Sequence, residues 1–190
     1  MASPDPWEHH PVLSPTHPLD ARTLTGLLQP DARSCGACCV VAARAVRDPA
    51  YAAWLHESGL WDDEVLGTHR RLTALVDHGR PGVPWLRAIG TPPWAVARRL
   101  RSTTGRGWRT RWRPRATAMR AVRTALEEGL PVPVYVGSKV LPRHVLLAVG
   151  LDPGTDEVLA YDPARGRVLA LSWLTSVGWP RVWAVVLPTR

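Results

Sequence analysis

Apolar side chains fill nearly every position from 34 to 47, and only Arg44 and Arg47, which stand three residues apart, would face outward from a helix. A helix that is apolar almost all round must be buried, so this run predicts a central helix. Ser34 is placed to cap the start of that helix, and Asp48 followed by Pro49 is expected to end it.

Three further segments repeat their apolar residues with the period of one helical face. They span residues 63–78, 92–100 and 115–128. Gly79 and Pro81 close the first segment, and Gly129 closes the third. Thr91 is placed to cap the second, with Pro92 in its first turn. The first two thirds of the chain are therefore predicted to be mainly helical.

From residue 130 onward, short runs of Val and Leu alternate with turn residues, which is the pattern of β-strands. The predicted strands cover residues 132–136, 144–149, 157–161, 167–171 and 182–187. The connections at 152–154 and 162–166 are short, so neighbouring strands should be antiparallel. Pro133 cannot donate to a ladder, and we expect it at a sheet edge or a bulge. Helices followed by an antiparallel sheet predict an α+β fold.

The 190 residues suit one compact domain, and the composition changes only once along the chain. Residues 1–22 form a Pro- and His-rich arm with little apolar periodicity, and residues 23–190 form the predicted domain. No stretch is apolar enough for a signal peptide or a membrane span. The three cysteines lie within five positions, which excludes a disulfide framework. We therefore expect a cytoplasmic protein without a membrane partner.

The formal charge of +8 comes mainly from arginine, and the arginines are densest over residues 98–115. Trp108 and Trp112 interleave with them, and basic segments that contain aromatic residues can bind phosphates and stack on bases. A non-catalytic module that binds nucleic acid is therefore one alternative for this chain. No named binding motif accompanies the run, so we favour a solvated surface and do not expect nucleic acid as a partner.

The cluster Cys35-Gly36-Ala37-Cys38-Cys39 allows three chemical interpretations. A zinc site would need a second Cys pair, or a His pair at finger spacing, and neither follows. Thiol–disulfide exchange through Cys35 and Cys38 would need a strand before the motif, but residues 27–33 are typical of a loop. The third interpretation makes Cys35 a nucleophile at the start of the buried helix, where the helix dipole favours the thiolate.

A cysteine nucleophile needs a histidine partner, and His144 is the candidate because it alone among seven histidines opens a strongly apolar strand. Asp162 ends the next predicted strand, and two neighbouring antiparallel strands can bring a histidine and a carboxylate together. The carboxylate would then hold the imidazole in one tautomer. A purely structural histidine at the mouth of a strand is the alternative for His144.

Three motifs together resemble a known family. Gln29 stands six residues before Cys35-Gly36, residues 143–150 read Arg-His-Val-Leu-Leu-Ala-Val-Gly, and residues 161–166 read Tyr-Asp-Pro-Ala-Arg-Gly. Over about residues 25–187 the chain resembles the papain-like cysteine peptidases, in particular the bacteriocin-processing, double-glycine-leader peptidases and their stand-alone relatives. The resemblance implies a papain-like fold in which Gln29 supplies the oxyanion hole, Cys35 attacks, and the His144–Asp162 pair activates the thiol.

The same resemblance distinguishes between the cysteines. The plant-type papain signature would make Cys38 the nucleophile, but Cys39 stands where that signature has an aromatic residue and Ala32 stands where the glutamine would be needed. Ser34 departs from the family pattern, which has an aspartate before the nucleophile. We therefore expect a cysteine peptidase-like hydrolase that acts on a peptide or protein substrate and needs no metal or organic cofactor. Transamidation, deamidation and ligation would use the same residues.

Overall fold

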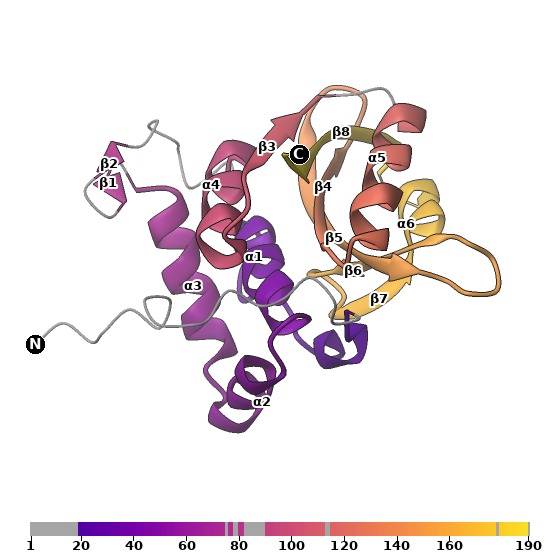
Figure 1. Cartoon of the computed structure of the whole chain (residues 1–190). Helices are drawn as coiled ribbons and strands as arrows, with labels where there is room; N and C mark the ends of the chain where they lie inside the picture. Colours follow the sequence, from indigo (N-terminus) through magenta and orange to yellow (C-terminus); the bar gives the residue numbers. More distant parts are fainter. Residues whose placement is uncertain are drawn as a thin grey trace, which may run out of the picture.

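The computed structural model of the chain describes residues 19–74, 76–77, 80–81, 90–112, 115–177 and 179–189. Its helices are η1 (Ala21–Leu24), α1 (Cys35–Ala45), α2 (Pro49–Ser58), α3 (Trp61–Leu72), α4 (Pro93–Thr104), α5 (Arg115–Glu127) and α6 (Leu171–Val177). Its strands are β1 (Val76–Asp77), β2 (Arg80–Pro81), β3 (Trp108–Arg111), β4 (Val132–Gly137), β5 (Pro142–Leu151), β6 (Val158–Asp162), β7 (Arg167–Ala170) and β8 (Arg181–Pro188). Figure 1 shows α1 to α4 on one side of the molecule and a sheet with α5 and α6 on the other.

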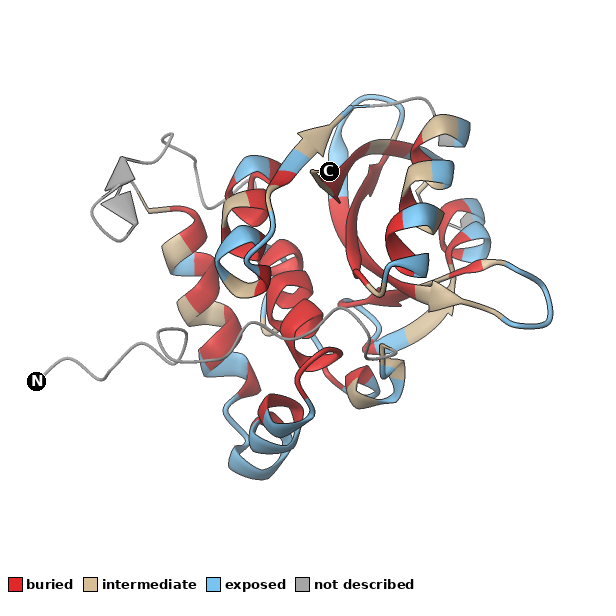
Figure 2. Cartoon of the chain, viewed as in Figure 1, coloured by how far each residue is buried: buried red, intermediate tan, exposed pale blue. Residues whose placement is uncertain are grey.

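Helix α1 lies at the centre of the fold, as predicted from its sequence. Every one of its residues is buried, and the helix is drawn in a single colour for that reason in Figure 2. It packs against α3 on one side and against β5 on the other. The two arginines of the run, Arg44 and Arg47, are also buried, and Arg44 lies over the ring of Tyr51 with its Cζ 3.8 Å from the ring centroid.

Helix α2 was not predicted from the sequence. Asp48 is its N-cap and accepts a hydrogen bond from the Tyr51 backbone N–H at 3.0 Å, while Pro49 occupies the first turn. The same Asp-Pro pair that follows the end of α1 therefore also begins the next helix. Gly59 ends α2 in the left-handed conformation, at φ 68°.

The other three predicted helices form with shifted boundaries. Helix α3 covers residues 61–72 instead of 63–78, the pair β1–β2 follows it, and Gly79 lies outside the described residues. Pro92 is the N-cap of α4, so the prediction that Thr91 caps this helix is wrong, and the Thr91 hydroxyl bonds to His69 instead. Helix α5 agrees with its prediction, and Gly129 follows it in the left-handed conformation.

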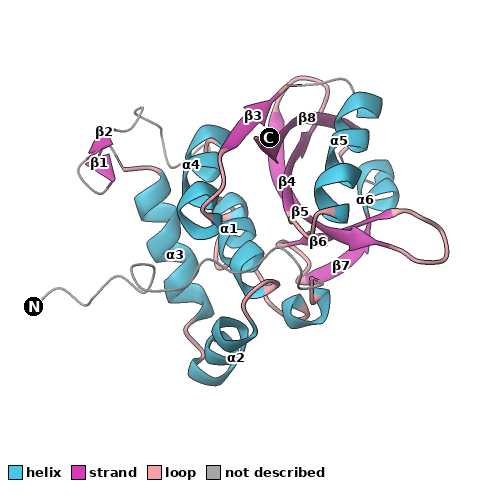
Figure 3. Cartoon of the chain, viewed as in Figure 1, coloured by secondary structure: helices cyan, strands magenta, loops and turns pink. Residues whose placement is uncertain are grey.

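Six strands form one antiparallel sheet in the order β3-β8-β4-β5-β6-β7 (Figure 3). The five predicted strands are β4 to β8, with ends that differ from the prediction by at most two residues. Helices followed by an antiparallel sheet confirm the α+β class. Strand β3 and the short helix α6, which begins at Leu171 directly after β7, were not predicted as elements.

Strand β4 lies between β5 and β8, so the expectation that Pro133 stands at an edge is wrong. The register shifts of β4 fall between Tyr135 and Gly137, so Pro133 is not at a bulge either. Pairing with β8 begins only at Val134, while Pro133 is opposite Leu147 of β5. The proline therefore takes part in one ladder alone, which is how an inner strand accommodates its missing N–H.

Strand β4 and residues 144–149 of β5 are buried on both faces, because α1 packs against one side of the sheet and α5 lies on the other in Figure 1. This explains why their sequences are continuous apolar runs without alternation. Because α1 packs against β5, the start of this helix lies near the first residues of that strand. Residues near 35 and residues near 144 therefore come together although they are far apart in the sequence.

The described part of the predicted arm contacts the domain. The backbone N–H of Asp20 donates to the carbonyl oxygen of Val46 at 3.2 Å. Leu19 and Ala21 pack against the core. Residues 19–22 therefore belong with the domain and not with a loose arm. None of the helices in the described ranges has the length and apolar character that crossing a membrane requires.

Candidate active site

Cys35 is the first residue of α1, and a turn held by Asp31 sets its position. The Asp31 carboxylate accepts hydrogen bonds from the backbone N–H groups of Arg33 and Ser34, both at 2.8 Å. Burial raises the pKa of Asp31, but these hydrogen bonds outweigh it, and the pKa lies below its ordinary value. Ser34 is the N-cap residue, but its side chain makes no capping hydrogen bond, so only its position agrees with the prediction.

The residue after the candidate nucleophile must be glycine. A Cβ on Gly36 would lie 2.7 Å from the Cβ of Thr91, so the start of α1 approaches residue 91 as closely as a backbone without a side chain allows. Thr91 is fixed in turn, because its Oγ1 lies 3.2 Å from Nδ1 of buried His69 and its carbonyl accepts from the Tyr135 hydroxyl at 3.1 Å. These contacts hold the helix start rigidly.

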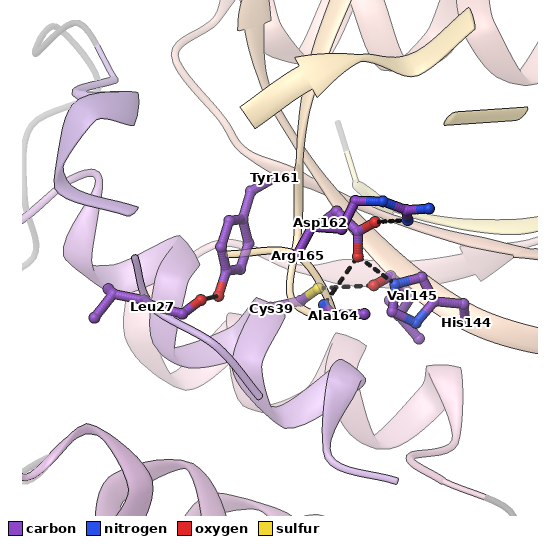
Figure 4. A network of polar contacts seen from close by, with 8 residues as sticks. All are labelled: Leu27, Cys39, His144, Val145, Tyr161, Asp162, Ala164 and Arg165. Atoms are coloured by element: carbon purple, nitrogen blue, oxygen red, sulfur yellow. Dashed lines mark hydrogen bonds and ion pairs between the residues drawn. The ribbon is translucent and has the colours of Figure 1, made fainter. Parts of the chain in front are cut away.

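His144 and Asp162 lie together, as their places at the ends of two strands predict. Strands β5 and β6 pair with Leu147 opposite Tyr161, which places Asp162 opposite Leu146 and diagonal to His144. Nε2–H of His144 donates to Oδ1 of Asp162 at 2.7 Å (Figure 4). The imidazole is 6% exposed and the carboxylate 0%. Such a short, buried hydrogen bond fixes the ring and leaves Nδ1 as the other nitrogen.

Asp162 is held ionised by several donors. Besides His144, the backbone N–H of Ala164 donates to Oδ1 at 2.9 Å and the guanidinium of Arg165 pairs with Oδ2, as Figure 4 shows. Burial raises the pKa of Asp162, but the hydrogen bonds from His144 and Arg165 overcome this effect and lower it below the ordinary value. The carboxylate therefore stays charged beside the imidazole.

The surroundings of His144 favour its imidazolium form. Burial lowers its pKa, but the hydrogen bonds with Asp162 and Cys35 and the negative charges of those two groups raise the pKa to about 9. The ring of Trp179 stacks on the imidazole with a centroid separation of 5.4 Å and an interplanar angle of 26°. His144 thus bonds to the carboxylate and interacts electrostatically with the Cys35 thiol, while an indole covers its face.

The loop that carries Gln29 is tied to the turn that follows Asp162. The Gln29 backbone N–H donates to the carbonyl of Pro163 at 2.8 Å, and the Tyr161 hydroxyl donates to the carbonyl of Leu27 (Figure 4). The side-chain Oε1 of Gln29 is buried and accepts no hydrogen bond within the part of the chain that the structure describes. His144 is hydrogen-bonded to Asp162, and the Cys35 thiol acts on His144 closely enough to raise its pKa, whereas Gln29 is tied to this group through the hydrogen bond of its backbone N–H to Pro163.

The other two cysteines are inside the core. Burial raises the pKa of the Cys38 and Cys39 thiols well above their ordinary values. The thiol of Cys39 donates to the carbonyl of Val145 at 3.5 Å, next to His144 in β5 (Figure 4). All three cysteines are free and buried, but Cys35 keeps 6% of its surface exposed whereas Cys38 and Cys39 keep none. Only Cys35 combines a helix start with a contact to His144.

Sequence reasoning did not find Arg165, Trp179 or Thr91. Arg165 follows Asp162 by three residues within one turn, and this spacing is the one signal that could have indicated it. Trp179 precedes β8, far from His144 in the sequence, and no pattern connects the two. Thr91 contributes through the space it occupies, which a sequence does not reveal.

Across the ranges described above, no three His, Cys, Asp or Glu side chains are grouped as metal ligands would be. Compared with models of known protein families and with curated proteins, the sequence gives no match.

Proposed function

We propose that the chain is a papain-like cysteine hydrolase or acyl transferase that acts on peptide or related amide bonds, with Cys35 as nucleophile. The observation that carries this proposal is the buried His144, which is hydrogen-bonded to Asp162 and whose pKa is raised by the thiol of Cys35 at the first residue of α1. A thiol, a base and a group that orients the base form the arrangement that activates a cysteine nucleophile.

Four residues and one backbone N–H group take part in the proposed reaction. The Cys35 thiolate attacks the amide carbonyl, and the negative charge that develops on its oxygen is met by a backbone N–H at the start of α1 and by the Gln29 amide. The His144 imidazolium then gives its proton to the leaving nitrogen as the C–N bond breaks, which leaves a thioester on Cys35. Water or another acceptor attacks the thioester, gives a proton to His144, and releases the acyl group.

Three further observations support these roles. The pKa of about 9 keeps His144 protonated at neutral pH, ready to donate to the leaving group. The carboxylate of Asp162 is held in place by donors other than the histidine. The Gln29 side-chain oxygen is buried and has no hydrogen-bond partner among the residues described, so none of those residues holds this amide in another role.

Thiol–disulfide exchange fits the same residues less well. The resolving thiol would be Cys38, whose burial raises its pKa well above the ordinary value and disfavours the thiolate that exchange requires. The described residues before α1 form the turn η1 and a loop, where a redox motif of this spacing would follow a strand.

Unbiased peptide-cleavage profiling tests the proposal. Wild type should cleave a subset of a complex peptide mixture, Cys35→Ala should cleave none, and Cys39→Ala, which removes a core thiol, serves as the matched control and should retain cleavage. Addition of a primary amine separates transfer from hydrolysis, because an acyl transferase would give amide products in place of free acids. If Cys35→Ala cleaves the same peptides as wild type, the proposed nucleophile is wrong.

A further inference from the structure

The fold divides the basic segment over residues 98–115 into two groups with different surroundings. Arg99 and Trp108 are buried, and the Trp108 indole N–H donates to the Thr104 hydroxyl at 2.7 Å. Arg106 and Arg109 are exposed. The prediction of a uniformly solvated surface is therefore wrong for the buried pair, and the Arg–Trp alternation that stacking on bases would use is interrupted at Trp108.

Three arginines of the segment line one hollow of about 690 Å³. The hollow lies where β3, the end of β8 and one face of α5 come together, near the top of Figure 1. Arg109 and Arg111 are two residues apart on β3 and so point to the same side of the strand, while Thr124 lies on α5 and Glu128 is the residue that follows this helix. Two elements thus turn polar side chains toward one space.

Positive charge is in excess in this hollow. Among the residues described, its lining contains Arg106, Arg109 and Arg111 and one carboxylate, Glu128, which pairs with Arg106 at 3.0 Å. Among the residues that the structure describes, Arg109 has no ion pair or side-chain hydrogen bond. Burial lowers the pKa of the neighbouring Arg47, and the positive charge of Arg106 lowers it further. Charge of one sign gathered in a concave space favours an anionic ligand.

We propose that this hollow binds a small molecule that carries two or more linked phosphate groups. Three guanidinium groups offset by one carboxylate match a ligand with more than one negative charge, and the planar fork of arginine binds phosphate oxygens in pairs. The volume lies within the range of small-molecule sites and exceeds the space a single phosphate needs. The threonine hydroxyl of Thr189 adds a neutral donor to the lining.

This site is separate from Cys35 and does not depend on the proposed function. Along β4, Val136 is opposite His144 on one side and Val182 of β8 on the other. The hollow is lined by residues 187–189, at least five positions further along β8. Because a strand rises by about 3.3 Å per residue, five positions along β8 separate the hollow from the level of His144 by roughly 16 Å or more.

The probe for the test is inorganic tripolyphosphate, titrated by calorimetry at low ionic strength. Wild type should bind it saturably at one site, and Arg109→Gln should weaken binding tenfold or more, because a charge-assisted hydrogen bond is lost from a side chain that supports no other contact. Arg101→Gln is the matched control, since Arg101 is exposed at the end of α4 and does not line the hollow; it should change the affinity less than twofold. Glu128→Gln should tighten binding, because it frees Arg106.

Titrations with other ligands show which kind of phosphate compound the hollow binds. Equal affinity for tripolyphosphate and for ATP would support recognition of the phosphates alone, and tighter binding of ATP would support a nucleotide. An oligonucleotide that binds more tightly than either, with a loss on Trp112→Ala, would overturn the proposal in favour of nucleic acid. Equal weakening by Arg101→Gln and Arg109→Gln would also overturn it, since the effect would then be one of overall charge.

Discussion

Replacing Asp162 with asparagine removes the negative charge beside His144 and keeps the shape of the side chain. In the wild type, the partners of His144 raise its pKa from the ordinary 6.5 to about 9. This rise corresponds to roughly 3 kcal/mol in favour of the imidazolium. Asparagine offers a weaker acceptor while burial, which lowers the pKa, remains. The pKa of His144 should therefore fall back toward 6.5.

The alkylation rate of Cys35 by iodoacetamide measures this change. At about pH 7.5 the wild-type imidazole is almost fully protonated and stabilises a thiolate beside it, whereas in Asp162→Asn most of the imidazole is neutral. An unassisted thiol has only a few per cent thiolate near neutral pH, so we expect the rate to fall by about tenfold or more. The rates should converge at high pH, where the thiol ionises without help.

Two control measurements exclude other causes of a slower alkylation rate. Asp63→Asn, an exposed aspartate in the first turn of α3, should leave the profile unchanged. Thermal unfolding at the same pH identifies any loss of the folded state in Asp162→Asn. If the two rate profiles of wild type and Asp162→Asn superimpose while both proteins are folded, then Asp162 does not control the ionisation of His144.

Three other predictions follow from the same contacts. Arg165→Met should raise the pKa of Asp162, because it removes one of the hydrogen bonds that lower it, and the acid limb of the Cys35 alkylation profile should move to higher pH. Gly36→Ala should lower the unfolding free energy in urea by about 1–3 kcal/mol, since its Cβ would lie 2.7 Å from the Thr91 Cβ. The folded-state pKa of His144 is raised, so its stabilising effect is complete below about pH 6.5 and is lost as the pH rises through about 9. The difference in unfolding free energy between wild type and His144→Gln should accordingly be larger at about pH 6 than at about pH 10.

The first two of these predictions have a control variant. Arg165→Lys keeps the charge and should restore part of the acid limb. Gly67→Ala introduces a methyl group that lies 3.8 Å from the flexible end of the Arg71 side chain, so it should be neutral or stabilising. A Gly36→Ala protein as stable as wild type would show that α1 can shift away from Thr91. A His144→Gln difference that grows with pH would contradict the direction of the pKa change.

The sequence predicted the elements whose pattern is extreme. Helix α1 was recognisable because its apolar residues leave no outward face, and the strands after residue 130 because turn residues separate them. Helix α2 was not predicted because an Asp-Pro pair can either follow the end of one helix or begin the next, and Asp48-Pro49 does both. The position of β4 between two strands depends on the pairing partners of β8, which no local pattern contains.

The candidate site was predictable only as far as strand ends and a helix start reveal it. Cys35, His144 and Asp162 stand at such positions, and the short connection between β5 and β6 indicated neighbouring antiparallel strands that could bring the last two together. Their diagonal placement depends on a register that shifts between Ala148 and Gly150, which the sequence does not show. The contacts of Trp179 and Arg165 come from tertiary packing and turn geometry, so only the folded chain reveals them.

The most direct test of the proposed nucleophile is the order in which the three neighbouring cysteines react. After brief alkylation of the folded protein at neutral pH, mass spectrometry should find the label on Cys35 first. Cys38 and Cys39 should react slowly, because burial disfavours their thiolates and the core blocks access. His144→Ala should slow the labelling of Cys35. Preferential labelling of Cys38, or equal labelling of all three that does not depend on His144, would contradict the account.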